Sequence, residues 1–221
     1  MQITLSALLC LDIVNKKESS MVYAQHHEEE IIDKYLGDVV NGTYVDIGAG
    51  DASDLSNTYG LYLKGWTGLT IDALEQEAAG HKKLRPNDIH LTIAVIDYDG
   101  EIDMCDSATA GSYLGVEYST VGTQYGTVYP IRKEKCLTIN TLISQYPQFA
   151  DTDFFSLDVE TSEDKVLAAC DFEKFTPTLI IIENEVRGKD LRSNWIHFID
   201  PYYDLVETIP GNLVFLRKVS K

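Results

Sequence analysis

The stretch Thr43-Tyr44-Val45-Asp46-Ile47-Gly48-Ala49-Gly50-Asp51 decides the fold class of this chain. Apart from one acidic residue, its first five residues are β-branched, aromatic or aliphatic, which is typical of a short buried strand. Gly48 and Gly50 follow with one residue between them, a spacing that lets the backbone of a turn approach a bound ligand closely. The stretch therefore predicts a buried strand that ends at a ligand-binding turn.

The segments on either side extend this strand into a larger unit. Downstream, Leu55–Lys64 predicts a helix that ends at Gly65, and Thr67–Ile71 predicts a second apolar strand. Upstream, residues 28–40 carry an apolar stripe at helical spacing, with an acidic first turn that suits the helix dipole. We expect residues 1–42 to form an N-terminal helical segment that leads into a β-α-β unit.

The same alternation of elements continues along the rest of the chain. Further helices are predicted at Leu74–Leu84, Leu137–Tyr146 and Glu163–Ala169, and further strands at Ile89–Ile96, Phe154–Leu157 and Leu179–Ile182. The last two strands are predicted at Tyr203–Ile209 and Leu213–Arg217, joined by a tight turn. This pattern predicts an α/β domain over residues 1–221, with a mostly parallel sheet and an antiparallel C-terminal hairpin.

Residues 98–136 interrupt the alternation. They are rich in Gly, Ser, Thr and Tyr, and long irregular segments within a compact domain commonly cover a functional site. We interpret them as a cap insertion.

Composition narrows the classes of partner. The 221 residues carry 35 Asp and Glu against 18 Lys and Arg, a formal charge of -17, which disfavours nucleic acid as a partner. The four cysteines form no zinc-type motif and indicate reduced thiols in a cytoplasmic protein. Asp12 interrupts the apolar stretch Leu5–Val14, so we expect neither a signal peptide nor a membrane span.

Acidic residues end each of the five predicted parallel strands: Asp46, Asp72, Asp97, Asp158 and Glu183. Ligands of such sheets bind beyond these ends. Asp46 suits an ammonium group and Asp72 can accept both hydroxyls of a ribose, while the glycine turn lacks the third glycine of a dinucleotide site. These features favour S-adenosylmethionine as the cofactor. An ordinary tight turn at Gly48 and a helix-capping role for Asp72 remain open.

The fourth and fifth strand ends predict the catalytic group. Asp158 and the pair Glu183-Asn184 would converge if these strands are neighbours, and their oxygens suit Mg²⁺ or Mn²⁺. Such a metal would lower the pKa of an attacked hydroxyl. Alternatively, Asp158 and Glu160 act without a metal, one as the general base. His26 or His27 is a further candidate base, whereas His90 lies inside a predicted strand.

Several blocks of the sequence resemble the FkbM family of methyltransferases, whose members often contain Ser-Gln-x-Gly-Glu-Asp, Asp-Ile-Gly-Ala-x-Asp-Gly, Ser-Asn-Thr and Gly-Trp-x-Gly. The similar blocks, within residues 23–218, are Ala24-Gln25-His26-His27-Glu28-Glu29, Asp46 to Asp51, Ser56-Asn57-Thr58, Gly65-Trp66-Thr67-Gly68, and Phe154 to Glu160 with Ile182-Glu183-Asn184. Where the family usually has Asp-Val-Glu-Gly-x-Glu, this chain places Thr161 at the glycine.

The resemblance implies a class I methyltransferase fold with a seven-stranded Rossmann-like sheet. It also implies methyl transfer from S-adenosylmethionine to a hydroxyl, commonly of a sugar or glycoconjugate. The residues that would bind the cofactor are Gln25, Asp46, Gly48, Gly50, Asn57, Asp72, Ala94 and Val95, and those that would serve catalysis are Asp158, Glu160 and Glu183. A polyketide or other small-molecule hydroxyl, an amine, and a non-catalytic binding module that keeps the fold are the alternatives. No feature indicates an oligomeric state.

Overall fold

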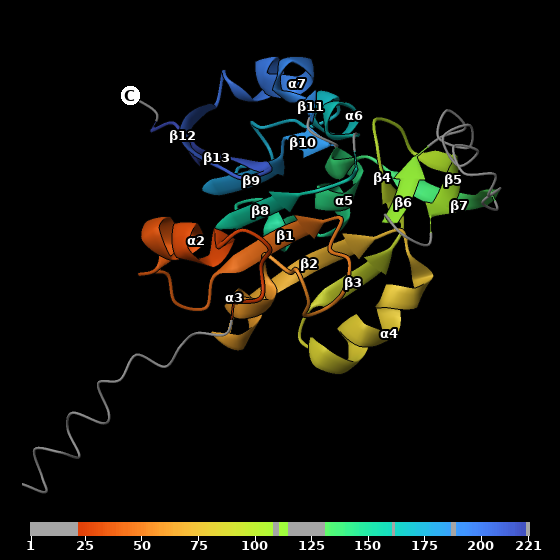
Figure 1. The fold of residues 1–221 in the computed structure, drawn as a ribbon, viewed down its shortest axis with the longest axis horizontal. Coiled ribbons are helices and arrows are strands. Elements are labelled where there is room, and N and C mark those ends of the chain that lie inside the picture. The colour runs from red at the N-terminus through yellow and green to blue at the C-terminus, as the bar shows by residue number, and fades with distance from the viewer. Residues whose placement is uncertain (1–21, 108–110, 115–130, 161, 187–188, 220–221) are drawn as a thin grey trace, which may run out of the picture.

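A seven-stranded sheet forms the centre of the molecule (Figure 1). The computed structural model describes residues 22–107, 111–114, 131–160, 162–186 and 189–219. The strand order is β12 (Tyr203–Ile209), β13 (Asn212–Arg217), β9 (Leu179–Glu183), β8 (Phe154–Leu157), β1 (Thr43–Ile47), β2 (Thr67–Asp72) and β3 (Ile89–Thr92). Strands β1, β2, β3, β8 and β9 are parallel, whereas β13 is antiparallel to both β9 and β12. This arrangement confirms the predicted fold class, a class I methyltransferase sheet with an antiparallel C-terminal hairpin.

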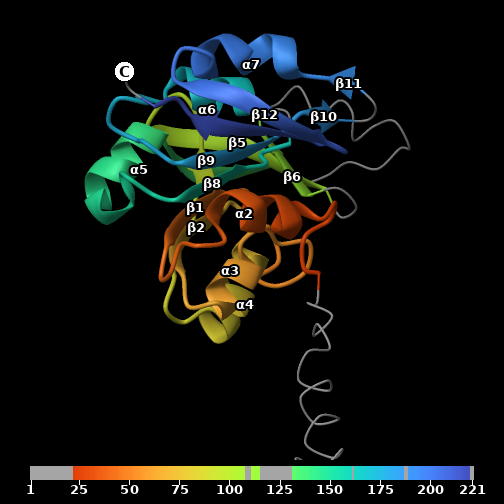
Figure 2. The same ribbon diagram turned by 90° about the vertical axis from the view of Figure 1, so that its left-hand side faces the viewer.

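Helices cover both faces of this sheet (Figure 2). One face carries α2 (Glu28–Leu36), α3 (Tyr59–Leu63) and α4 (Glu75–Leu84), and the other carries α5 (Ile139–Gln145), the 3-10 turn η3 (Pro147–Phe149), α6 (Glu163–Ala168) and α7 (Arg192–Ile199). In β1, Tyr44 joins an apolar cluster with Ile32 of α2, while Val45 joins the opposite cluster with Trp195 of α7. Successive side chains of β1 point into apolar clusters on opposite faces of the sheet, which explains why almost all of its residues are apolar.

The segment interpreted as an irregular cap contains a second sheet instead. Its order is β4 (Ala94–Val95), β7 (Ile131–Leu137), β5 (Gly100–Ser107) and β6 (Gly111–Leu114), and a small hairpin of β10 (Glu185–Val186) and β11 (Lys189–Asp190) lies elsewhere. β5 is antiparallel to both β6 and β7. β5 and β7 are separated by residues 108–130 along the chain, so no local sequence pattern signals their pairing. Residues 108–110 and 115–130 fall outside the described part of the chain.

Two other predicted elements differ from the structure, and one helix was not predicted at all. The strand expected at Ile89–Ile96 divides, because β3 follows β2 only to Thr92 and β4 then pairs with β7. The helix expected from Leu55 begins at Tyr59, since Leu55 has a φ of 54°, which a right-handed helix does not allow. Helix α7 was not predicted.

The register of the parallel strands aligns their carboxyl ends. Ile47 is the partner of both Ile71 in β2 and Leu157 in β8. The residues that follow these three positions, Gly48, Asp72 and Asp158, therefore emerge side by side at one edge of the sheet. No helix within the described residues is long and apolar enough to cross a membrane, and Leu5–Val14 lies outside them.

Candidate functional site

The glycine turn after β1 lies directly against the neighbouring strand ends. Gly48 has a φ of +82°, and its backbone N–H donates to the carbonyl of Ile71 at 2.9 Å. A Cβ atom at Gly48 would lie 1.6 Å from the carbonyl oxygen of Asp158. The positive φ and this close approach together require glycine at the position. The turn after β1 is therefore packed against the ends of β2 and β8.

Asp72 is fixed in place by two backbone groups. Its Oδ2 accepts a hydrogen bond from Gly50 N at 2.9 Å, and its Oδ1 accepts one from Leu74 N at 2.7 Å, just before α4. A carboxylate has about four acceptor sites, so each oxygen retains a lone pair for a ligand. Supporting the start of α4 and binding a ribose are thus compatible roles.

A cavity of about 460 Å³ opens at these strand ends. This volume is within the usual range for small-molecule sites. Of the predicted cofactor and catalytic residues, those that line it are Gln25, Gly48, Gly50, Asp72, Ala94, Val95, Asp158, Glu160 and Glu183. Its six acidic lining residues are Asp51, Asp54, Asp72, Asp158, Glu160 and Glu183, and within the described part of the chain no Lys, Arg or His lines it. The cavity is therefore suited to a neutral or cationic ligand.

Met104 also lines the cavity, on the side of Ala94 and Val95. It belongs to β5 in the second sheet, where it is buried. No sequence pattern points to this residue, because its position depends on the pairing of β5 with β7.

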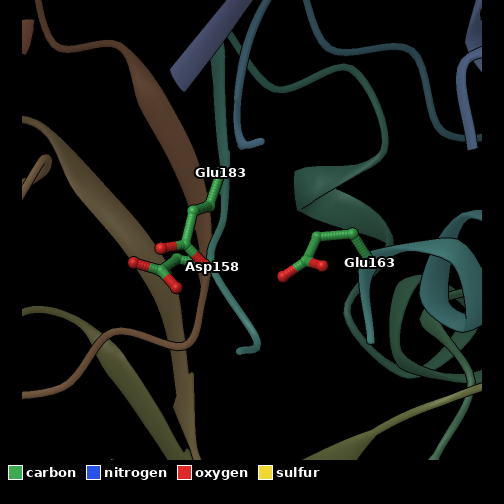
Figure 3. A group of neighbouring side chains, drawn as sticks. All are labelled: Asp158, Glu163 and Glu183. Carbon is green, nitrogen blue, oxygen red and sulfur yellow. The ribbon is translucent and has the colours of Figure 1, made fainter. Parts of the chain in front are cut away.

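Asp158 and Glu183 lie together at the floor of the site (Figure 3). Parallel pairing of Leu157 with Ile182 places the two acidic residues at adjacent strand ends. Burial raises the pKa of Glu183, and the neighbouring carboxyl group of Asp158 raises it further. Burial among protein atoms also raises the pKa of Asp158, although its side chain is open to the cavity. A pair of this kind holds one proton between its members when no cation is bound.

Glu163 is a site residue that the sequence analysis treated only as the start of a helix. Its side chain is 1% exposed, and its Oε1 accepts a hydrogen bond from Val159 N at 3.1 Å. Ligand oxygens of Asp158, Glu163 and Glu183 all lie within 4.8 Å of one another (Figure 3). Asn184, which was predicted as the third metal ligand, directly follows Glu183, and its place in a metal site stays a prediction.

Asp46 and Asn57 point into the protein beneath the turn rather than lining the cavity. Asp46 is 3% exposed and accepts a 2.5 Å hydrogen bond from Thr58 Oγ1, which in turn accepts one from Arg85 Nη2 at 2.8 Å. Asn57 Nδ2 donates to Ser156 Oγ at 3.1 Å. Burial raises the pKa of Asp46, and the charge of Arg85 opposes this rise. Direct contact of either residue with a cofactor stays a prediction.

The loop after β8 carries backbone strain. Glu160 has a φ of 52° although it is not glycine, and it lines the cavity. Non-glycine residues in this conformation cost of order 1–3 kcal/mol and are commonest at functional sites. Thr161, which stands where the FkbM pattern usually has glycine, lies outside the described residues.

Histidines support the site from beneath. The rings of His81 and His90 stack with their centroids 4.0 Å apart, and His81 Nε2 lies 3.0 Å from the carbonyl oxygen of Gly50. Burial lowers the pKa of His81 to about 4, so the ring is neutral at pH 7. This arrangement agrees with the structural role expected for His90. His26 and His27 are not among the lining residues.

Comparisons with known proteins found no matching family model and no matching curated protein. Three solved structures are similar in fold. A TehB-like SAM-dependent methyltransferase from Corynebacterium glutamicum is 12% identical, with 96% of this chain and 95% of that chain covered and a TM-score of 0.46. A methyltransferase from Geobacter sulfurreducens is 8% identical, with 100% and 92% covered and a TM-score of 0.44. An O-methyltransferase from Bacillus cereus in complex with SAH is 12% identical, with 98% and 93% covered and a TM-score of 0.47. The class I fold assignment itself rests on the strand order and directions of this chain.

Proposed function

We propose that this protein is an S-adenosylmethionine-dependent methyltransferase of the FkbM type. The observation that carries the proposal is the cavity at the strand ends, where the glycine turn and Asp72 meet a lining with six carboxylates. A cofactor with an ammonium and a sulfonium group gains from such a lining, whereas a cofactor that carries phosphates would be repelled. The sequence blocks that resemble the FkbM family support the same assignment.

Each part of the cofactor has a matching group in the cavity. Asp72 is placed to accept the ribose hydroxyls, because its oxygens retain lone pairs and its position is fixed. The turn at Gly48 and Gly50 leaves its backbone open for the methionine portion. Ala94 and Val95 are both 3% exposed and form an apolar wall for the adenine. When bound, the cofactor supplies an electrophilic methyl group on its sulfonium sulfur.

Because the Asp158–Glu183 pair holds one proton, its one ionised carboxylate is placed to accept the proton of an acceptor hydroxyl. An alcohol loses this proton as its oxygen attacks, so a carboxylate within hydrogen-bond reach assists transfer. The acceptor oxygen becomes a methyl ether, the proton passes to the carboxylate, and the bond between sulfur and methyl breaks. Glu160, on the strained loop beside them, is the alternative base.

The same carboxylates fit a divalent metal. Asp158, Glu163 and Glu183 offer oxygens within 4.8 Å of one another, and hard oxygen donors suit Mg²⁺ or Mn²⁺. Two buried oxygens, Glu183 Oε2 and Asn184 Oδ1, have no hydrogen-bond partner among the described residues. The amide oxygen of Asn184, the residue after Glu183, is therefore available as a metal ligand. A metal held here would lower the pKa of a coordinated acceptor hydroxyl.

A hydroxyl of a sugar or glycoconjugate is the proposed acceptor. The FkbM resemblance supports it, and the lining disfavours phosphorylated acceptors and nucleic acid. A polyketide or another small-molecule hydroxyl or amine is the competing acceptor. A cytoplasmic location belongs to the same proposal, on the strength of the cysteine pattern.

Titration calorimetry tests the cofactor, and labelled methyl transfer tests the acceptor. We expect S-adenosylmethionine and S-adenosylhomocysteine to bind, with no heat from NAD or ATP. Binding of NAD or ATP alone would refute the methyltransferase assignment. Tritiated methyl transfer to a panel of neutral glycans should label oxygen, and label found only on amines or proteins would refute the sugar acceptor.

A further inference from the structure

The segment before α2 carries Gln25 to the cavity. Residues 23–27, which we call the N-terminal strap, precede the helix, and Gln25 is their one residue on the cavity lining. The Gln25 side chain is exposed and has no hydrogen bond within the described part of the chain. Its neighbour Ala24 is 7% exposed, so the strap is packed against the protein directly before the exposed side-chain amide of Gln25.

Glu28 ties the strap to the end of the central sheet. It is the first residue of α2 and is 1% exposed. Its Oε2 accepts a hydrogen bond from His26 N at 2.7 Å, and its Oε1 accepts one from Asn212 Nδ2 at 2.8 Å. A buried carboxylate that has both oxygens occupied by such donors holds its partners at fixed positions.

Glu29 holds the other half of the strap. Its Oε1 accepts hydrogen bonds from Tyr23 N at 2.5 Å and from Ala24 N at 2.7 Å. The carbonyl of Tyr23 accepts a hydrogen bond from Ser56 N at 3.0 Å, and its ring packs edge-on against Tyr59 at 4.9 Å. The amides on both sides of Gln25 are therefore bound by carboxylates from the helix that follows.

The contact with Asn212 connects the strap to the catalytic pair. Asn212 begins β13 and is the register partner of Glu183 in β9. In the same turn, Asn184 N donates to the carbonyl of Gly211 at 2.7 Å. A shift of Glu28 would thus move the strap relative to the strand that bears Glu183.

We propose that Glu28 is a positioning residue of the active site. It holds Gln25 over the cofactor and fixes the position of Gln25 relative to the strand that bears Glu183. The inference rests on the proposed function, because it assigns Gln25 a contact with the cofactor. Glu28 acts through Gln25 and does not touch the cofactor itself.

Exchange of the hydrogen-bond partners tests this role. Glu28→Gln keeps the size but can no longer accept from both donors. The double variant Glu28→Gln with Asn212→Asp restores both hydrogen bonds. The side-chain amide introduced at position 28 can donate to the carboxylate introduced at position 212, and its oxygen can still accept from His26 N. Asp38→Asn, at an exposed position just after the same helix, is the matched control. Each variant is measured by amide hydrogen exchange of residues 22–28 and by calorimetry with S-adenosylhomocysteine.

We expect Glu28→Gln to speed exchange of the strap amides at least tenfold and to weaken S-adenosylhomocysteine binding at least fivefold. The double variant should return both values to within about twofold of the wild type. Gln25→Ala should weaken binding without changing exchange, and adding Glu28→Gln to it should cost little more, because residues that act through one another are not additive.

Unchanged exchange and affinity in Glu28→Gln would overturn the inference, as would full additivity with Gln25→Ala. Glu29→Ala, which removes the oxygen that accepts from Tyr23 N and Ala24 N, gives an independent test should Glu28→Gln fail to fold. If the wild-type protein binds no S-adenosylhomocysteine, the proposed function fails, whereas the exchange data still decide whether Glu28 holds the strap.

Discussion

Gly48 and Asp158 approach so closely that a methyl group on the glycine would lie 1.6 Å from the carbonyl oxygen of the aspartate. The contact joins the glycine turn of the proposed cofactor site to the strand end that bears the proposed catalytic base. The backbones of the glycine turn and of the end of β8 are therefore in direct contact, and a side chain at Gly48 would push these two segments apart.

Gly48→Ala should be strongly destabilising. The new Cβ meets backbone atoms, which cannot rotate away, and the φ of +82° is unfavourable for alanine. We expect a loss of more than about 3 kcal/mol in the free energy of unfolding. Gly50→Ala is the matched control, because its φ is +51° but no atom lies within 4 Å of the new Cβ; it should lose about 1 kcal/mol. Urea denaturation measures both, and equal losses would contradict the steric argument.

Asp72→Asn should weaken cofactor binding while the fold persists. The amide nitrogen can no longer accept from Gly50 N or from a ribose hydroxyl, and charge-assisted hydrogen bonds contribute about 1.5–3 kcal/mol each. We expect at least a tenfold rise in the Kd of S-adenosylhomocysteine by calorimetry. Asp51→Asn, at an exposed position of the same lining, is the control and should change the Kd by less than threefold. An unaltered Kd in Asp72→Asn would remove the ribose role.

Asp158→Asn should separate turnover from cofactor binding. The cofactor contacts are proposed mainly on β1 and β2, so the Kd of S-adenosylhomocysteine should stay within about threefold while turnover falls at least a hundredfold. A parallel loss of affinity would place Asp158 in the cofactor site instead.

Chelation should abolish turnover if a metal serves the site, and Mg²⁺ or Mn²⁺ should restore it. The geometry further predicts that Glu163→Gln weakens Mn²⁺ binding, because an oxygen of Glu163 lies within 4.8 Å of ligand oxygens of Asp158 and Glu183. Paramagnetic resonance of Mn²⁺ measures this directly. Full activity in EDTA would leave Asp158 or Glu160 as the base.

Acid should destabilise the protein through His81. Burial lowers its pKa from 6.5 to about 4 in the folded state, so between these values the unfolded chain binds the proton more strongly. Stability is complete above pH 6.5 and falls as the pH drops towards 4, by roughly 3 kcal/mol for this group. His81→Gln should flatten the fall seen in melting temperature, whereas His197→Gln, at an exposed position, should not. An identical profile in all three proteins would exclude His81 as the cause.

Much of the fold could be predicted from the sequence because it depends on local patterns. The apolar strands, their acidic ends and the glycine turn are each visible within a few residues, and parallel neighbours bring such ends together. Asp72, Asp158 and Glu183 were found in this way, and all three line the cavity.

The residues that were missed depend on distant partners. Met104 reaches the cavity through a strand pairing across the long insertion. Glu163 faces Asp158 because of how α6 packs, which no spacing predicts. The buried network of Asp46, Thr58 and Arg85 beneath the turn was also missed, because nothing near Arg85 in the sequence signals that it is buried.

The pairing of β4 with β7 has a consequence for how this protein could be diversified. β4 supplies the wall proposed for the adenine, and its hydrogen bonds come from the insertion, whose Arg132 also donates to the carbonyl of Ala73. The insertion is thus part of the frame of the site and not a removable cover. A chimera that exchanged residues 98–136 with those of a relative to gain a new acceptor would also inherit a new adenine wall, and it would have to be selected for both.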